Sequence, residues 1–291
     1  MSPLPSPEIH TGATPVTVVR ATSGGFSGRE DAVANEEPLE IRVSYEKRGG
    51  LRVTRSLSVT MRTPGNDAEL ACGFLFGEGI VRDAGEIVDV GPAEGVAGGN
   101  VVVVSLAPGT EVDLGSLERH FYTTSSCGVC GKTSIEALRL KCRALQPTDA
   151  PQMDFEDILR MPERLRGAQG AFDQTGGLHG AGLFDASGGL ICAREDVGRH
   201  NAVDKVIGSR LLAGAFPLSA TALAVSGRAS FELMQKALMA GIPILVAVGA
   251  PSSLAVKLSR QFGATLVGFV REGRFNIYSG AHRVRGANPA Q

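Results

Sequence analysis

The chain contains 291 residues, of which 43% are hydrophobic and 20% are charged, and its formal net charge is −1. These values are those of a soluble globular protein, and they lack the basic excess of a general nucleic-acid binder. Tryptophan is absent and only 3 tyrosines are present, which disfavours an aromatic platform for stacking bases. Residues 1–15 lack the apolar core of a signal peptide, and no apolar run reaches transmembrane length. We therefore expect a cytoplasmic protein with neither a nucleic-acid nor a membrane partner.

The chain is long enough for two domains. Residues 1–14 are rich in Pro, Ser and Thr, which predicts a disordered tail, and the Gly- and Ser-rich segment 22–35 is expected to be a loop. Residues 15–122 are predicted to form a small α+β domain. Residues 123–285 are predicted to form an α/β domain.

The smaller domain begins with a predicted hairpin. Apolar and polar residues alternate over 39–46 and over 51–61, and the turn-forming pair Gly49-Gly50 lies between the two stretches. The other elements predicted for this domain are a helix from Asn66-Asp67 to Phe74 and strands near 86–90 and 100–106.

The larger domain shows a different pattern. A second hairpin is predicted over 182–191. Apolar runs of strand length then alternate with helical segments; the runs are 222–225, 244–248 and 266–269, and the helices are 231–239 and 254–262. This order calls for parallel strands joined by right-handed crossovers, in a sheet covered on both faces. Such sheets bind their ligands beyond the carboxyl ends of the strands.

Two cysteines stand at the start of a predicted helix, in Ser126-Cys127-Gly128-Val129-Cys130-Gly131-Lys132. A thiol in the first turn faces unpaired N–H groups and the positive end of the helix dipole, and Lys132 adds a cation. These features favour a nucleophilic thiolate. A C-x-x-C pair alone is also typical of zinc ribbons, thioredoxin-like proteins and inert buried pairs. The other cysteines are expected to be buried small hydrophobic residues: Cys72, Cys142 and Cys192.

Polar loops follow the predicted strands of the larger domain, and they carry arginines. The loops are Ser226-Gly227-Arg228-Ala229-Ser230, Val270-Arg271-Glu272-Gly273-Arg274 and the run from Arg194 to Asn201. Guanidinium groups and helix N-termini bind phosphates or a pyrophosphate, although each arginine could equally be a solvated turn residue. His200 and Asp204 are expected to make only a helix-surface contact, and His179 is expected to be structural.

Taken together and in this order, these segments resemble the FdhD/NarQ family of sulfur carriers that are needed to make active formate dehydrogenase. The resemblance covers nearly all of residues 35–280. Its most specific part is the run Arg194-Glu195-Asp196-Val197-Gly198-Arg199-His200-Asn201-Ala202-Val203-Asp204-Lys205. Further matching parts are Gly73-Phe74-Leu75-Phe76-Gly77-Glu78-Gly79-Ile80, the C-x-x-C segment and Thr175-Gly176-Gly177-Leu178-His179.

The resemblance implies a homodimer whose larger domain has a cytidine-deaminase-like three-layer α/β/α fold. It implies a sulfurtransferase: a cysteine desulfurase would load sulfur as a persulfide on Cys127, and Cys130 would assist its transfer. The acceptor would be the bis-molybdopterin guanine dinucleotide cofactor of molybdenum or tungsten, on its way into formate dehydrogenase. The family's cofactor-binding segment falls on Phe269-Val270-Arg271-Glu272-Gly273-Arg274, and GDP would serve as a fragment of this cofactor.

Other classes of protein stay open at this point. A zinc-dependent deaminase would need an H-x-E or C-x-E arrangement upstream of Cys127, and His10, His120 and Cys72 are not followed by such a glutamate. A thioredoxin-like oxidoreductase would place its cysteines early in a much shorter βαβ fold. A non-enzymatic chaperone that binds the molybdenum cofactor, with the cysteines as mere contacts, is compatible with the sequence.

Overall fold

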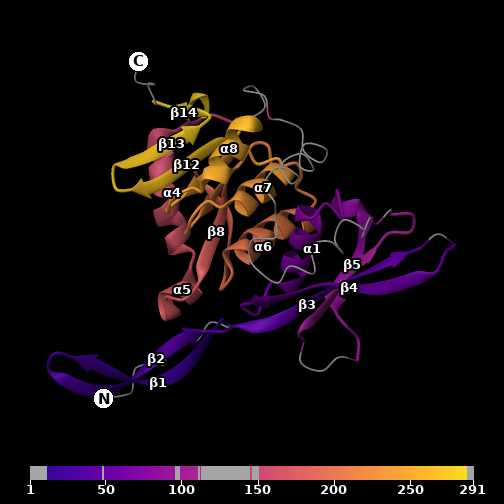
Figure 1. The fold of residues 1–291 in the computed structure, drawn as a ribbon, viewed down its shortest axis with the longest axis horizontal. Helices are drawn as coiled ribbons and strands as arrows, with labels where there is room; N and C mark the ends of the chain where they lie inside the picture. The colour runs from indigo at the N-terminus through magenta and orange to yellow at the C-terminus, as the bar shows by residue number, and fades with distance from the viewer. Residues whose placement is uncertain are drawn as a thin grey trace.

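The computed structural model describes residues 12–47, 49–95, 99–110, 112, 145 and 151–286. Its first element is an arm in which β1 (Ala13–Thr22) pairs with β2 (Gly25–Ala34) in antiparallel register, and which extends away from the body (Figure 1). The prediction of a loop over 22–35 is therefore wrong, and residues 13 and 14, which were predicted to belong to a disordered tail, lie in β1. Ala13 is buried, and the carbonyl of Gly12 accepts a hydrogen bond from the Asn35 N–H at 2.9 Å.

The first half of the chain forms a four-stranded sheet in the order β4-β3-β6-β5. The predicted hairpin of β3 and β4 is confirmed, and the two further predicted strands are β5 and β6. The bounds are β3 Glu37–Glu46, β4 Arg52–Arg62, β5 Ile87–Pro92 and β6 Val101–Leu106. Helix α1 (Asp67–Gly77) packs on this sheet, and the short 3-10 turn η1 (Ala84–Glu86) precedes β5.

The second half forms a six-stranded sheet in the order β13-β12-β11-β10-β8-β9. The predicted parallel arrangement of β10, β11 and β12 is confirmed, and β8 and β13 run antiparallel to their neighbours. The bounds are β8 His179–Phe184, β9 Leu190–Asp196, β10 Ala222–Val225, β11 Ile244–Ala247, β12 Thr265–Arg271 and β13 Arg274–Ser279. A separate short pair is formed by β7 (Met153–Asp154) and β14 (Val284–Arg285), which follows the 3-10 turn η2 (Ala281–Arg283).

Helices cover both faces of the six-stranded sheet (Figure 1). Ala222 and Ala224 face a core that includes α4, whereas Leu223 and Val225 face a larger core shared with α6, α7 and α8. This alternation is why each four-residue strand reads as a continuous apolar run. The bounds are α4 Phe155–Gly167, α5 Gly170–Thr175, α6 Arg199–Leu212, α7 Phe231–Met239 and α8 Ser253–Gln261. The likeness to cytidine deaminases stays a prediction.

The two halves meet where α1 crosses α6. A Cβ atom added at Gly73 would overlap the carbonyl of Asp204, and one added at Gly208 would overlap the carbonyl of Glu69. The helix backbones therefore touch, and this contact needs glycine at both positions. Among the described residues, no helix is long and apolar enough to cross a membrane.

Candidate functional site

The loops predicted to carry the site meet at one edge of the six-stranded sheet, which we call the carboxyl edge. Strands β9 to β12 end there, and β8 begins there because it is antiparallel to β10. Helices α6, α7 and α8 all start at this edge, so their first N–H groups and positive dipole ends face it. Two of these helices are capped by serines: Ser230 Oγ accepts from the Leu233 N–H, and Ser252 Oγ from the Ala255 N–H.

Basic side chains gather at the carboxyl edge. Burial lowers the pKa of His179, and the neighbouring charges of Arg199 and His200 lower it further, against a smaller opposing effect of Asp196. His179 is therefore uncharged near neutral pH and can both donate and accept hydrogen bonds. The Nε atom of Arg199 is buried and has no hydrogen-bond partner among the described residues. An unpaired buried donor at a helix start is suited to an anionic ligand.

His200 points to the neighbouring helix start. Its Nε2 lies 3.4 Å from Ser230 Oγ and 3.7 Å from Glu232 Oε2. The hydrogen bond from His200 is the main cause that lowers the pKa of Glu232 to about 2. Because Ser230 and Glu232 approach the same ring nitrogen, this group is not a Ser-His-acid triad, in which the two partners contact different nitrogens.

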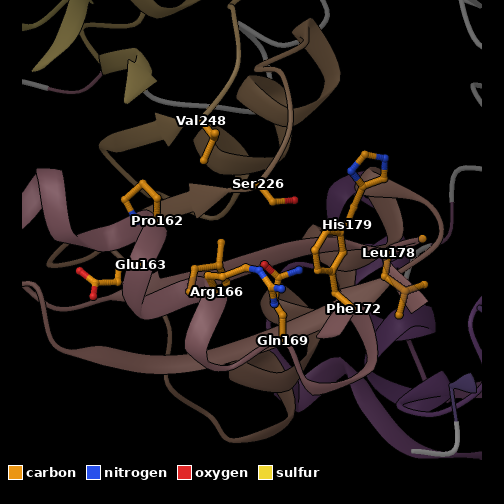
Figure 2. A pocket seen from close by; sticks show the side chains of 12 residues that line it. Pro162, Glu163, Arg166, Gln169, Phe172, Leu178, His179, Ser226 and Val248 are labelled. Carbon is orange, nitrogen blue, oxygen red and sulfur yellow. The ribbon is translucent and has the colours of Figure 1, made fainter. Parts of the chain in front are cut away.

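A cavity of about 680 Å³ opens beside the carboxyl edge (Figure 2). Helices α4 and α5 provide one side, and the starts and ends of β8, β10 and β11 provide the other. The lining residues are Pro162, Glu163, Leu165, Arg166, Gln169, Phe172, Gly176, Gly177, Leu178, His179, Ser226 and Val248. The guanidinium of Arg166 stacks on the Phe172 ring at 4.4 Å from its centroid and forms an ion pair with Asp173. His179, expected to be merely structural, is thus part of the wall.

Gln169 is a candidate binding residue that the sequence did not reveal. It is 3% exposed, and its Nε2 has no hydrogen-bond partner among the described residues. A buried donor without a partner costs about 1–3 kcal/mol, so its place in the cavity lining makes it a candidate hydrogen-bond donor to a ligand. No local pattern marks a single glutamine between two helices, and only the three-dimensional neighbourhood distinguishes it.

The segment Phe269–Arg274 forms the end of β12, a turn and the start of β13. Arg271 pairs with Arg274 across the turn, and Gly273 takes the positive φ of 71° that the turn requires. The side chain of Val270 is buried in the core, so this residue can offer only its backbone to a ligand. The other side chains are exposed.

Phe269 stands at the β12 end of this turn. It has a φ of 55°, which is uncommon for a residue other than glycine, and it is 37% exposed. Its N–H donates to the carbonyl of Gly249 at 3.1 Å, next to the cavity residue Val248. A strained residue with an exposed aromatic ring at a strand end is a candidate ligand contact.

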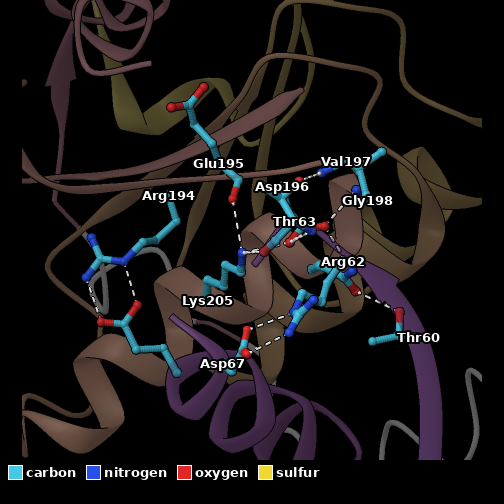
Figure 3. Close-up of polar contacts among 12 residues, drawn as sticks. Thr60, Arg62, Thr63, Asp67, Arg194, Glu195, Asp196, Val197, Gly198 and Lys205 are labelled. Carbon is cyan, nitrogen blue, oxygen red and sulfur yellow. Dashed lines mark hydrogen bonds and ion pairs between the residues drawn. The ribbon is translucent and has the colours of Figure 1, made fainter. Parts of the chain in front are cut away.

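The specific run from Arg194 to Lys205 does not form a phosphate site at its first residue. Arg194 makes a two-pronged ion pair with Glu69 of α1, at 2.5 and 2.7 Å (Figure 3). Asp196, fully buried, accepts from the Thr63 N–H at 3.1 Å and forms an ion pair with Lys205 Nζ at 2.7 Å. These contacts link β9 and α6 to α1 and to the end of β4. We call the five residues that make them the inter-sheet junction: Thr63, Glu69, Arg194, Asp196 and Lys205.

The predicted surface contact between His200 and Asp204 is wrong. Asp204 is buried, and its carboxylate contacts Lys236 Nζ of α7 at 2.7 and 2.9 Å. The reason is that α6 is covered by both α1 and α7, so the face that carries Asp204 is internal.

Cys72 is fully buried as predicted, and burial, with a contribution from Glu69, raises its pKa to about 12. Cys192 is only half-buried, with its Sγ 3.8 Å from Ser209 Oγ. Cys127, Cys130 and Cys142 lie outside the described residues.

Three comparisons with known proteins point to the same family, and each of them covers most of the chain. A sequence profile described as the FdhD/NarQ family matches residues 34–285. A sulfur carrier protein FdhD from Streptomyces avermitilis is 50% identical over 273 residues, which cover 92% of this chain and 94% of that protein. One from Mycolicibacterium paratuberculosis is 51% identical over 272 residues, which cover 92% and 97%. The solved structure of a protein described as a formate dehydrogenase accessory protein from Desulfotalea psychrophila matches with a TM-score of 0.71 at 28% identity, covering 94% of this chain and 99% of that one.

Proposed function

The chain belongs to the FdhD/NarQ family, and we propose that it is a sulfurtransferase that carries sulfur to the molybdenum cofactor of formate dehydrogenase. A cysteine desulfurase is the donor. The thiolate of Cys127 attacks the terminal sulfur of the donor's persulfide, the donor's S–S bond breaks, and the donor cysteine leaves as a thiolate. The persulfide then stands on Cys127, and Cys130 assists its onward transfer. The protein works as a homodimer in the cytoplasm.

The acceptor of the sulfur is bis-molybdopterin guanine dinucleotide, which this protein handles as a substrate. Such a molecule carries pyrophosphates and several flat heterocycles, so it needs a long site with cations, free N–H groups and apolar walls. The carboxyl edge offers these features side by side, and this is the observation that supports the substrate half of the proposal. Arg199 and three helix starts suit the phosphates, and the unpaired Nε2 of Gln169 supports the binding of a polar heterocycle in the cavity.

The exposed turn at the end of β12 extends this site. Arg271 and Arg274 are exposed and form no ion pair with another described residue, so both guanidinium groups are available to a phosphate. A charge-assisted contact of this kind contributes about 1.5–3 kcal/mol. Arg274→Ala should therefore weaken GDP binding about ten- to a hundredfold. Titration of GDP by calorimetry measures this, with the exposed arm variant Arg20→Ala as the control.

The proposed sulfur transfer through Cys127 is tested by activation of formate dehydrogenase in cells that lack the native carrier. Cys127→Ala should abolish activation, and Cys130→Ala should give a weaker or condition-dependent loss. Both variants should bind GDP like the wild type if the chain carries sulfur. A pure cofactor chaperone predicts instead that Cys127→Ala still activates the enzyme, and that outcome would overturn the carrier proposal.

A further inference from the structure

The orphaned amide of Gln169 is held firmly in place. The residue stands directly before α5, whose first N–H groups, of Ala171 and Phe172, donate to the Glu195 carboxylate at 3.0 and 2.8 Å. Its carboxamide lies against the backbone of β8, where a Cβ atom at Gly180 would come within 2.5 Å of the Gln169 Cδ. The amide is therefore packed closely between the start of α5 and β8.

The chemistry around the amide selects the kind of ligand. The walls next to it are mainly apolar and include the Phe172 ring and Leu178, which suits a flat ring system. In Figure 2 the side chains of Arg166 and Gln169 converge in the cavity. A donor that is buried among such walls requires an acceptor on the ligand, and the acceptor that a planar heterocycle offers most strongly is a ring carbonyl.

We propose that Gln169 is a specificity-determining residue that recognises the ring carbonyl of an amino-oxopyrimidine, the group shared by guanine and pterin. This inference rests on the proposed function, which supplies a substrate that contains both rings. Adenine is discriminated against because it presents an amine where guanine presents O6, so two donors would face each other and Nε2 would stay unpaired. Hypoxanthine keeps the carbonyl and lacks only the amine, so the site accepts it.

The experiment measures the affinities of GDP, IDP, ADP and neopterin for the full chain by calorimetry. Wild-type protein should bind GDP and IDP within a few-fold of each other and ADP at least about tenfold more weakly, the value of one lost hydrogen bond. Gln169→Glu replaces the donor by an acceptor of the same shape and should remove the preference for GDP over ADP. The ratio of two affinities measured on one preparation does not depend on the fraction of folded protein.

Two further variants separate recognition from damage to the fold. Gly180→Ala leaves Gln169 unchanged but displaces its amide, so it should lower the GDP/ADP ratio as Gln169→Glu does. Gln152→Glu makes the same chemical change at a glutamine whose Nε2 already has a partner, the His282 carbonyl at 3.0 Å, and should leave the ratio unchanged.

The outcomes distinguish this inference from the proposed function. GDP and ADP bound equally well by the wild type, or an unchanged ratio in Gln169→Glu, would overturn the role of Gln169 while leaving the proposed substrate site intact. No binding of GDP or neopterin would overturn both. Neopterin bound more tightly than GDP, with the same dependence on Gln169, would support the role and assign the cavity to the pterin end of the substrate.

Discussion

The inter-sheet junction and the carboxyl edge are both rich in charged residues, and they differ in whether the protein itself satisfies them. At the junction, Asp196 is paired with Lys205 and Arg194 with Glu69. At the edge, Arg199 Nε and Gln169 Nε2 lack partners among the described residues. Buried polar groups that are paired hold a fold together, whereas unpaired ones next to a cavity are maintained at a cost in stability and indicate binding. Within the most specific sequence run, Arg194, Asp196 and Lys205 thus serve the structure, whereas Arg199 stands at the carboxyl edge.

The largest effect is expected at the junction. Asp196→Ala leaves Lys205, which is 1% exposed, without its counter-charge, and should lower the free energy of unfolding by about 3–5 kcal/mol. Urea denaturation measures this loss. The matched control is Asp154→Ala, because Asp154 pairs with Arg285 in the open and should cost less than about 1 kcal/mol. Equal losses of unfolding free energy in the two variants would contradict the difference between the buried junction pair and the exposed pair.

The backbone contact between α1 and α6, next to the junction, gives the next largest effect. Gly208→Ala places a methyl group against the Glu69 carbonyl, and rigid backbone cannot yield as a side chain does. Overpacking of this kind costs about 1–3 kcal/mol. Thermal unfolding is the readout, and Gly167→Ala on α4, where an added Cβ meets nothing within 4 Å, is the control. A neutral Gly208→Ala would show that α1 and α6 are not in backbone contact.

At the carboxyl edge, removal of a charged side chain should no longer destabilise the fold. Arg199→Ala removes a buried donor that has no partner among the described residues, so unfolding stability should stay within about 0.5 kcal/mol of wild type or rise. GDP binding should weaken in the same variant, because the lost cation stands at a helix start that is proposed to bind a phosphate. A destabilised Arg199→Ala that binds GDP normally would place Arg199 among the structural residues.

The last prediction concerns the pH dependence of stability. The pKa of Glu232 is lowered from 4.5 to about 2 in the folded protein, so its interaction with His200 stabilises the fold above the unfolded value and is lost as the pH falls through the folded one. The stability difference between wild type and Glu232→Gln should therefore be larger near about pH 6 than near about pH 2. Urea denaturation at both values tests this. A constant difference would show that Glu232 titrates alike in both states.

Much of the fold could be predicted because strands and helices with buried faces leave periodic patterns. The short strands β10 and β11 are uniformly apolar since both faces of the sheet are covered, and the hairpin of β3 and β4 alternates. The arm was not predicted because β2 is rich in glycine and charged residues, which are typical of loops. The extended conformation of β2 depends on its pairing with β1. The pairing of Asp204 with Lys236 joins residues 32 positions apart, and local spacing favours the neighbour at four residues instead.

The sequence predicted where the polar loops of the larger sheet would meet, but it did not predict every residue that gathers there. The parallel strand order brings these loops to the carboxyl edge, and the arginines of the turn after β12 do lie exposed there. That these arginines bind the cofactor stays a prediction. The sequence did not predict that His179 lines a cavity, since one histidine in a glycine turn has no distinctive spacing. The partner of Arg194 is Glu69, far away in the chain, so its sequence neighbourhood could only show that it was a possible phosphate ligand.

The central claim is that Cys127 carries sulfur, and mass spectrometry tests it most directly. The protein is incubated with a cysteine desulfurase and cysteine, then digested without reductant. We expect one additional sulfur atom on the peptide that contains Cys127, none in Cys127→Ala, and unchanged loading in Arg274→Ala. Sulfur found only on Cys72 or Cys192, or an equal load in Cys127→Ala, would contradict the account.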